Sequence, residues 1–235
     1  MLRKIQRLAL SCFVGMVVLF GGAASAFADQ VDDWFIAIQN DYTGKVEDML
    51  KEGFDPNTVE MKRGDTGLIL AMREDSNRVL DLLLADKRTK LDIQAFNGDT
   101  ALMIACYKGN EAAVTKLLKK GAKVDKNGWT PLHYAAANGN NNIVKMLLAR
   151  DAFVNAASPN GTTPVMMAAE AGHVYTVKLL YENGADLTIA NQQKMTAIDF
   201  AKMNNNAAIA EGIAHLIKKE EEMDRIRNTL PKFPF

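Results

Sequence analysis

The pattern of apolar and polar residues repeats about every 33 residues from Asp32 onward. In each full period, a Thr precedes a helix-like apolar stretch that contains a pair of small residues. A Gly or polar residue follows, and then an apolar run with the spacing V-x-x-L-L, as in Val114–Leu118 and Val144–Leu148. The Thr residues lie 34, 30, 33 and 33 residues apart: Thr66, Thr100, Thr130, Thr163 and Thr196.

Each period predicts two short helices joined by a turn. Thr is a favourable N-cap, and Pro131 at the next position fits the first helical turn, where its missing N–H costs nothing. We expect the first helix to end at a left-handed residue, a role that suits Gly109, Gly139 and Gly172. The V-x-x-L-L run gives the second helix one apolar face. Because one unit cannot bury that face alone, the units must stack.

Six units are predicted, and the two end units differ from the others. The first lacks the Thr-Pro start, as expected of an N-terminal cap, and the sixth has Lys202 and Asn205 where other units have Ala and Gly. A longer loop is expected after Leu84, and a shorter connection before Trp129. We expect the last helix to extend through Ile226 and residues 228–235 to form a non-helical tail. The units start near residues 32, 64, 98, 128, 161 and 194.

This pattern resembles the ankyrin repeat, whose signature is T-P-L-H-x-A at a period of 33 residues. The segment Thr130-Pro131-Leu132-His133-Tyr134-Ala135 matches that signature at every position. The resemblance covers about residues 30–217 and implies an all-α repeat solenoid, with a β-turn finger between helix pairs. We therefore expect a repeat domain over residues 29–217, followed by a helix extension and tail over residues 218–235.

The first 28 residues have the pattern of an export signal. A basic start with Arg3, Lys4 and Arg7 precedes a 13-residue apolar run, and Ala26-Phe27-Ala28 forms an A-x-A cleavage site. The apolar run is short for a membrane span, which needs about 20 residues. We expect cleavage between Ala28 and Asp29 and a periplasmic or secreted protein; the alternative is an uncleaved membrane anchor.

Composition and charge exclude several classes of protein. The apolar fraction of 48% and the charged fraction of 24% are typical of a soluble globular chain. They exclude a disordered, a collagen-like and a multi-span membrane chain. Lys and Arg together number 28, as do Asp and Glu; removing residues 1–28 takes away three basic residues and no acid, leaving 25 against 28. Cys106 is then the only cysteine, which suits a bacterial periplasm.

Five lysines near the second helix of unit three form a local basic cluster: Lys116, Lys119, Lys120, Lys123 and Lys126. We interpret this cluster as a solvated face; the alternative is a binding site for anionic lipid or nucleic acid.

Candidate catalytic and metal-binding residues are scattered. Cys106 occupies a small-residue position, and the histidines His133, His173 and His215 belong to different units. No P-loop, G-x-G-x-x-G or H-E-x-x-H string is present, and no Cys and His residues have zinc-ligand spacing. We expect no catalytic residues, no cofactor and no metal.

The remaining candidate site is a protein-binding surface. In ankyrin proteins, partner-contacting positions lie on the fingers and on the exposed side of the first helices. Phe96, Tyr107 and Trp129 come from adjacent units, and aromatic residues of this kind are frequent interface hot spots. Trp129 could equally be packed against its own repeat. The resemblance implies eight partner-binding candidates on a concave face: Phe96, Asp99, Tyr107, Lys108, Trp129, Asn138, Thr162 and Glu170.

The leading hypothesis is a non-enzymatic periplasmic module that binds a client protein, not nucleic acid, through the concave face and finger tips. We expect a monomer without stable membrane insertion after signal cleavage. The first alternative is an inhibitor, immunity or accessory protein for one secreted enzyme, because Asp65, Asp99 and Glu170 would suit a basic client. The second is an enzyme on an ankyrin scaffold, which the scattered chemistry argues against.

Overall fold

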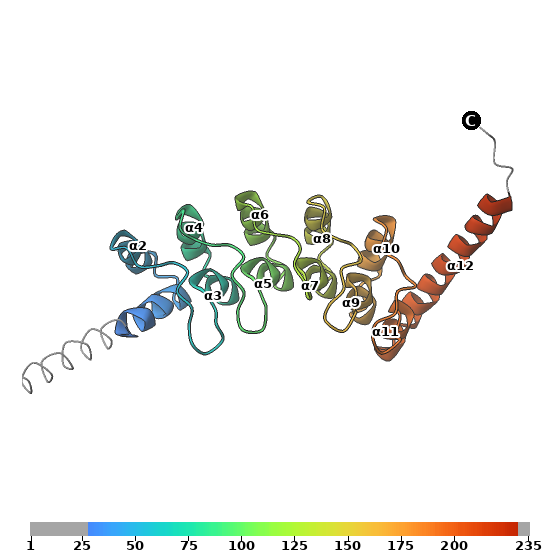
Figure 1. Ribbon diagram of the computed structural model, residues 1–235, viewed down its shortest axis with the longest axis horizontal. Helices are drawn as coiled ribbons and strands as arrows, with labels where there is room; N and C mark the ends of the chain where they lie inside the picture. Colours follow the sequence, from blue (N-terminus) through green and yellow to red (C-terminus); the bar gives the residue numbers. More distant parts are fainter. Residues whose placement is uncertain (1–27, 230–235) are drawn as a thin grey trace, which may run out of the picture. The chain divides into compact units, whose positions relative to one another are not determined.

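The computed structural model describes residues 28–229, which form twelve helices in two compact units. One unit ends at Thr89 and the other starts at Lys90, within the long loop expected after Leu84. No β-strand occurs between residues 28 and 229, where Val59 and Thr66 form one isolated antiparallel bridge. The helices form six consecutive pairs, so the predicted all-α repeat solenoid is confirmed (Figure 1). The predicted export signal lies outside the described residues, apart from Ala28.

The first unit contains two helix pairs. A helix over residues 28–39 places Trp34 in the core, where its ring centroid lies 4.8 Å from that of Phe54. Gly67 allows this helix a close approach, because a β-carbon there would lie 2.7 Å from Cδ1 of Ile38. The other helices are α2 (Thr43–Lys51), α3 (Gly67–Arg73) and α4 (Asn77–Ala85).

The second unit contains four helix pairs in two rows. Its first helices pack on one another in sequence, α5 on α7, α7 on α9 and α9 on α11, and the second helices α6, α8 and α10 lie in a second row (Figure 1). The first helices are α5 (Ala101–Tyr107), α7 (Pro131–Asn138), α9 (Pro164–Glu170) and α11 (Ala197–Met203). The second helices are α6 (Glu111–Lys120), α8 (Asn141–Leu148), α10 (Val174–Glu182) and α12 (Ala207–Thr229).

The five Thr residues of the sequence pattern are all N-caps. The side-chain oxygen of Thr66 accepts a hydrogen bond from the backbone N–H of Ile69, and Thr100 caps α5 in the same way through Met103. Thr130, Thr163 and Thr196 begin α7, α9 and α11. The small-residue pairs that follow in units two to five are buried, which allows adjacent first helices to pack closely; in unit six Ala201 is buried and Lys202 is exposed.

The turn after each first helix has the predicted left-handed residue. Gly109, Gly139 and Gly172 have φ of 68°, 79° and 83°. Asp75 and Asn205 take the same conformation with φ of 58°, as Asp and Asn can with less strain than most residues.

Polar side chains connect consecutive repeats in the second unit. The residues just before α10 and α12 donate to a backbone carbonyl near the end of the first helix of the preceding repeat. Nε2 of His173 lies 3.1 Å from the carbonyl oxygen of Ala137, and Nδ2 of Asn206 donates to that of Ala169 at 3.0 Å. In the first unit, Oγ of Ser76 donates to the carbonyl oxygen of Ile38. The sequence analysis did not predict these contacts.

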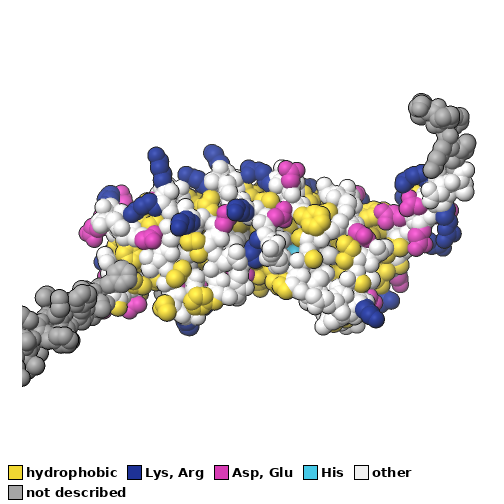
Figure 2. Space-filling view, viewed as in Figure 1, with side chains coloured by type: hydrophobic (Ala, Val, Ile, Leu, Met, Phe, Trp, Pro, Cys, Tyr) yellow, Lys and Arg dark blue, Asp and Glu magenta, His cyan; other side chains and the backbone are white. Residues whose placement is uncertain are grey.

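The short connection before Trp129 is stabilised by a lysine. Nζ of Lys126 donates to the carbonyl oxygens of Asn127 and Trp129, at 3.1 and 3.4 Å. One member of the predicted basic cluster therefore has a structural role. Figure 2 shows Lys and Arg side chains along the edge where α6 lies, as expected of a solvated face.

The last helix is longer than predicted. α12 ends at Thr229, so Asn228 and Thr229 are helical and not the start of the tail. Nη1 of Arg227 pairs with Oδ1 of Asp224 at 2.9 Å, and the Thr229 hydroxyl donates to the carbonyl oxygen of Ile226, which supports the final turn. The rest of the predicted tail lies outside the described residues.

We predict that Leu132→Ala lowers the free energy of unfolding by about 2–5 kcal/mol, because Leu132 is fully buried in α7. Chemical denaturation measures this loss. The exposed Lys145→Ala in α8 is the control and should stay within about 0.5 kcal/mol of the wild type. A wild-type denaturation curve for Leu132→Ala would contradict the repeat register.

We predict that Gly139→Ala destabilises the protein more than Gly121→Ala. Both glycines have positive φ, 79° and 95°, so both substitutions carry a left-handed backbone cost of about 1–2 kcal/mol. Only at Gly139 would the added β-carbon meet a side chain, 2.5 Å from Nδ1 of His173, whereas Gly121 faces open space. The difference in unfolding free energy should be at least about 1 kcal/mol; equal losses would show that the His173 ring yields freely.

Candidate functional site

A small aromatic pocket lies on the row of first helices in the second unit. Its volume is about 210 Å³. Tyr107 comes from the end of α5, Tyr134 from α7 and Met167 from α9, so three consecutive repeats contribute to it. The other lining residues are Trp129, His133 and Ala137. Typical small-molecule pockets measure about 300–1,000 Å³, so this one is sized for a single side chain.

The Tyr134 wall is fixed by a buried carboxylate. The Tyr134 hydroxyl donates to Oδ1 of Asp99 at 2.6 Å, and Nδ2 of Asn97 donates to Oδ2 of the same residue at 2.7 Å. The Tyr107 and Tyr134 rings meet edge to face with centroids 6.1 Å apart, a favourable aromatic geometry. The pocket is therefore preformed.

His133 holds the Trp129 side of the pocket. Its Nδ1 accepts from the backbone N–H of Thr130 at 3.1 Å, so the ring proton is on Nε2, which donates to the carbonyl oxygen of Thr162 at 2.9 Å. The Trp129 ring packs edge to face on this imidazole at 5.1 Å between centroids. Burial lowers the pKa of His133 to about 4, against hydrogen bonds with the Thr162 and Ala156 backbones that raise it. His133 therefore orders the turn at the start of α7 and connects it to the next finger.

Four of the eight candidate residues are exposed at the surface. Phe96 and Tyr107 are 70% and 61% exposed, and Lys108 and Asn138 are exposed as well. Nδ2 of Asn138 donates to the carbonyl oxygen of Tyr107, which connects α7 to α5. Tyr107 and Trp129 meet in the pocket, whereas Phe96 is not among its lining residues.

The expected exposure of Asp99 and Thr162 is wrong. They are only 4% and 2% exposed, because the residue before an N-cap closes the finger turn inside the stack. The backbone N–H of Ala95 donates to the carbonyl oxygen of Asp99, and that of Ser158 to the carbonyl oxygen of Thr162. Both residues support the pocket from behind instead of facing a partner.

The proposed acidic row along the binding face is also wrong. Asp65 is fully buried in the first unit, with its Oδ2 2.9 Å from Nε of Arg73 and 3.2 Å from Nε of Arg63. Asp99 is buried in the second unit, so only the half-buried Glu170 remains near the surface.

Trp129 is half-buried and has both of the roles considered for it. Its ring packs on His133 within its own repeat, and it also lines the pocket.

The pocket residues Tyr134, Ala137 and Met167 were not predicted from the sequence. A signal for two of them was present. Tyr134 and Met167 both occupy the variable position of the T-P-L-H-x-A signature, at the fifth residue counted from Thr130 and from Thr163. This position faces the pocket in α7 and α9, whereas the same position in α5, Ile104, is only 5% exposed.

The other candidate groups have structural surroundings. Cys106 is buried, and burial raises the pKa of its thiol, which disfavours the nucleophilic thiolate. Among residues 28–229, no three His, Cys, Asp or Glu side chains converge as metal ligands. No helix in the same range is long and apolar enough to cross a membrane.

Comparison with known protein families decides the classification. The family model of ankyrin repeats matches the chain three times, over residues 34–126, 68–158 and 151–225. The chain belongs to the ankyrin repeat family. Ankyrin repeats generally mediate protein–protein interaction, and the domain is typically a non-enzymatic scaffold.

Three curated relatives contain similar ankyrin repeats. The human transient receptor potential cation channel subfamily A member 1 is 31% identical over 48% of this chain and 10% of its own length. The human SH3 and multiple ankyrin repeat domains protein 2 is 32% identical over 74% of this chain and 10% of its own length. A palmitoyltransferase from Lachancea kluyveri is 32% identical over 47% of this chain and 16% of its own length. The chain therefore spans less than a fifth of each of these relatives.

We predict that the unfolding free energy falls by about 3 kcal/mol as the pH drops from 6.5 to 4, because unfolding returns His133 to its ordinary pKa. Between pH 6.5 and 4, the unfolded chain binds a proton at His133 that the folded chain does not bind. The stabilisation is therefore complete above pH 6.5 and is lost as the pH falls toward the pKa of His133 in the folded state, about 4. Denaturation at several pH values measures the slope. His133→Gln should reduce the dependence of the unfolding free energy on pH, whereas His215→Gln, at an exposed residue, should not. An unchanged slope in His133→Gln would assign the pH dependence to other groups.

Proposed function

We propose that this chain is a non-enzymatic protein-interaction module of the periplasm that binds a client protein at the aromatic pocket. The observation that carries the proposal is the preformed pocket around Tyr107 and Trp129 on the row of first helices. Its volume of about 210 Å³ suits one anchoring side chain of the client. The exposed residues Lys108, next to Tyr107 in the chain, and Asn138, which donates to the Tyr107 carbonyl, would form part of the rim of the interface.

The rigidity of the pocket favours binding without rearrangement. The walls are already oriented by the Tyr134–Asp99 and His133–Thr162 hydrogen bonds, so little side-chain entropy is lost when a client docks. Tyr107 is the least buried wall, at 61% exposure, and its burial would remove apolar surface from water. We therefore assign the central contact to Tyr107.

The periplasmic location is supported by sequence features alone. These are the basic start, the short apolar run, the A-x-A site ending at Ala28, and the single remaining cysteine, Cys106. An inhibitor or immunity role remains a narrower form of the same proposal. It has less electrostatic support than the sequence suggested, because Asp65 and Asp99 are buried.

The test is affinity capture. The bait is protein purified from cells that express the whole sequence, and the client is captured from a periplasmic extract of the native cells. We predict that the wild type captures one client, and that the Tyr107→Ala, Trp129→Ala double variant loses at least about tenfold in affinity, because both hot-spot rings are gone. Tyr175→Ala is the matched control, since Tyr175 on α10 is 78% exposed and is not among the residues that line the pocket.

Circular dichroism of each variant separates lost binding from lost folding. The single variant Tyr107→Ala keeps the Trp129–His133 contact and serves if the double variant is unstable. A client that binds folded Tyr107→Ala and Trp129→Ala with unchanged affinity would move the site away from the pocket. An equal loss of affinity in the control variant Tyr175→Ala would also move the site away from the pocket.

A further inference from the structure

The last helix extends beyond the repeats that support it. α12 has 23 residues, and only Ile209, Ala210 and Ile213 are buried. Leu216 and Ile217 are half-buried, and residues 218–229 are all exposed. An isolated helix of fewer than about 12–15 residues is marginal in water, so this extension would gain stability from a covering surface.

One face of α12 has the spacing of a helix-pairing surface. Gly212, Leu216, Lys219, Met223 and Ile226 follow one another at intervals of four and three residues, which aligns them along the helix. We call these five residues the α12 stripe. Met223 and Ile226 are 52% and 49% exposed, which is unusual for two apolar residues one turn apart on a charged helix.

The first part of the α12 stripe borders an apolar groove. Gly212, Leu216 and Lys219 line a pocket of about 450 Å³ between α10 and α12, together with Val174 and Val177 of α10. Val174 is 55% exposed there. The stripe thus presents an apolar recess at one end and two exposed apolar side chains at the other.

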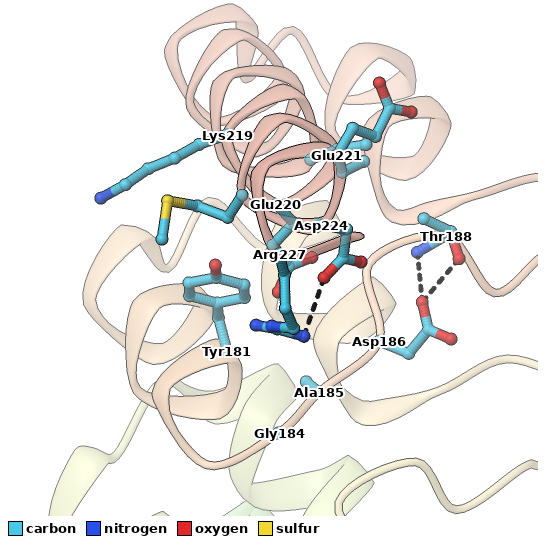
Figure 3. A pocket seen from close by; sticks show the side chains of 12 residues that line it. Tyr181, Gly184, Ala185, Asp186, Thr188, Lys219, Glu220, Glu221, Asp224 and Arg227 are labelled. Carbon is cyan, nitrogen blue, oxygen red and sulfur yellow. Dashed lines mark hydrogen bonds and ion pairs between the residues drawn. The ribbon is translucent and has the colours of Figure 1, made fainter. Parts of the chain in front are cut away.

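The extension also faces its own chain, and Lys219 and Met223 of the α12 stripe are among the residues on that side. Figure 3 shows α12 passing over Tyr181 and the loop that contains Gly184 and Thr188, where a second pocket of about 610 Å³ opens. Burial and the nearby Glu220 carboxylate raise the pKa of the Tyr181 hydroxyl, and Arg227 pairs with Asp224 within α12 (Figure 3). Tyr181 of α10 lines both pockets together with residues of α12, so α10 lies against the base of the extension.

The middle of α12 contains two adjacent blocks of opposite charge, with Glu211 before them and Arg225 and Arg227 after them. Lys218 and Lys219 are followed by four acids: Glu220, Glu221, Glu222 and Asp224. Figure 2 shows both kinds of charge on this helix. Two such helices side by side in the same direction would place like charges together. In opposite directions, with the centre near Lys219 and Glu220, the basic block of each helix faces the acidic block of the other.

We propose that α12 is a homodimerisation helix that pairs with α12 of a second copy in the antiparallel direction. A two-fold axis near Lys219 and Glu220 makes the contact self-complementary, as closed dimers require. It places Met223 of each copy opposite Leu216 of the other, and Ile226 next to the recess beside Gly212. Lys219 of each copy comes near Glu222 of the other. This dimer replaces the expectation of a monomer, and it is independent of the client-binding proposal.

Sedimentation equilibrium of protein purified from cells that express the whole sequence tests the dimer. We expect a monomer–dimer equilibrium whose dissociation constant rises at least about tenfold in the Met223→Asp, Ile226→Asp variant, because the substitution puts carboxylates into the apolar contact. Met203→Asp is the matched control, since Met203 is 64% exposed at the end of α11 and lies off the stripe. Circular dichroism checks that α12 stays helical.

A charge exchange tests the antiparallel direction. Lys219→Glu and Glu222→Lys should each weaken the dimer at least about fivefold, and the double variant should recover most of the loss, because the opposite charges still face each other. A wild-type monomer at about 100 µM would overturn the proposal, as would a dimer that the stripe variant leaves unchanged. A double variant that stays as weak as the single ones would overturn the antiparallel arrangement.

Discussion

The repeats depend on one another because each short first helix leaves about half of its carbonyl groups without a partner inside the helix. α5, α7, α9 and α11 have seven or eight residues, and the last four carbonyl groups of any α-helix lack partners within it. In the second unit, His173 and Asn206 each lie within hydrogen-bond distance of such a carbonyl in the preceding repeat. Stacking therefore satisfies polar groups as well as burying Leu132 and its counterparts, and a repeat alone would lose both contributions.

The aromatic pocket follows from the same stacking. Consecutive first helices bring Tyr107, Tyr134 and Met167 together although they lie about one period apart in sequence. The residues that orient these walls, Asp99 and Thr162, belong to the fingers and are buried. The family thus supplies a rigid frame, and the pocket's individual character comes from the few residues that vary within it.

The sequence predicted the frame better than the site. Thr130, Pro131 and Gly139 each have one favourable backbone role, so the helix starts and turns were predictable from residue type. Asp99 was misplaced because its exposure depends on Tyr134, a residue 35 positions away, which sequence spacing alone does not pair with it. The end of α12 was misjudged because the Arg227–Asp224 pair and the Thr229 hydroxyl extend the helix by local contacts that composition does not specify.

The division of the pocket among three repeats ties binding to local opening of the stack. Repeat proteins can fray from an end while the rest remains folded. If α9 detached along with the repeat after it, Met167 would leave the pocket while Tyr107, Trp129 and Tyr134 stayed in place. A client that fills the pocket binds only the closed form and so suppresses this fraying by mass action. Occupancy of the pocket would accordingly slow amide hydrogen exchange and proteolysis in α9 and α10, at a distance from the residues that the client touches.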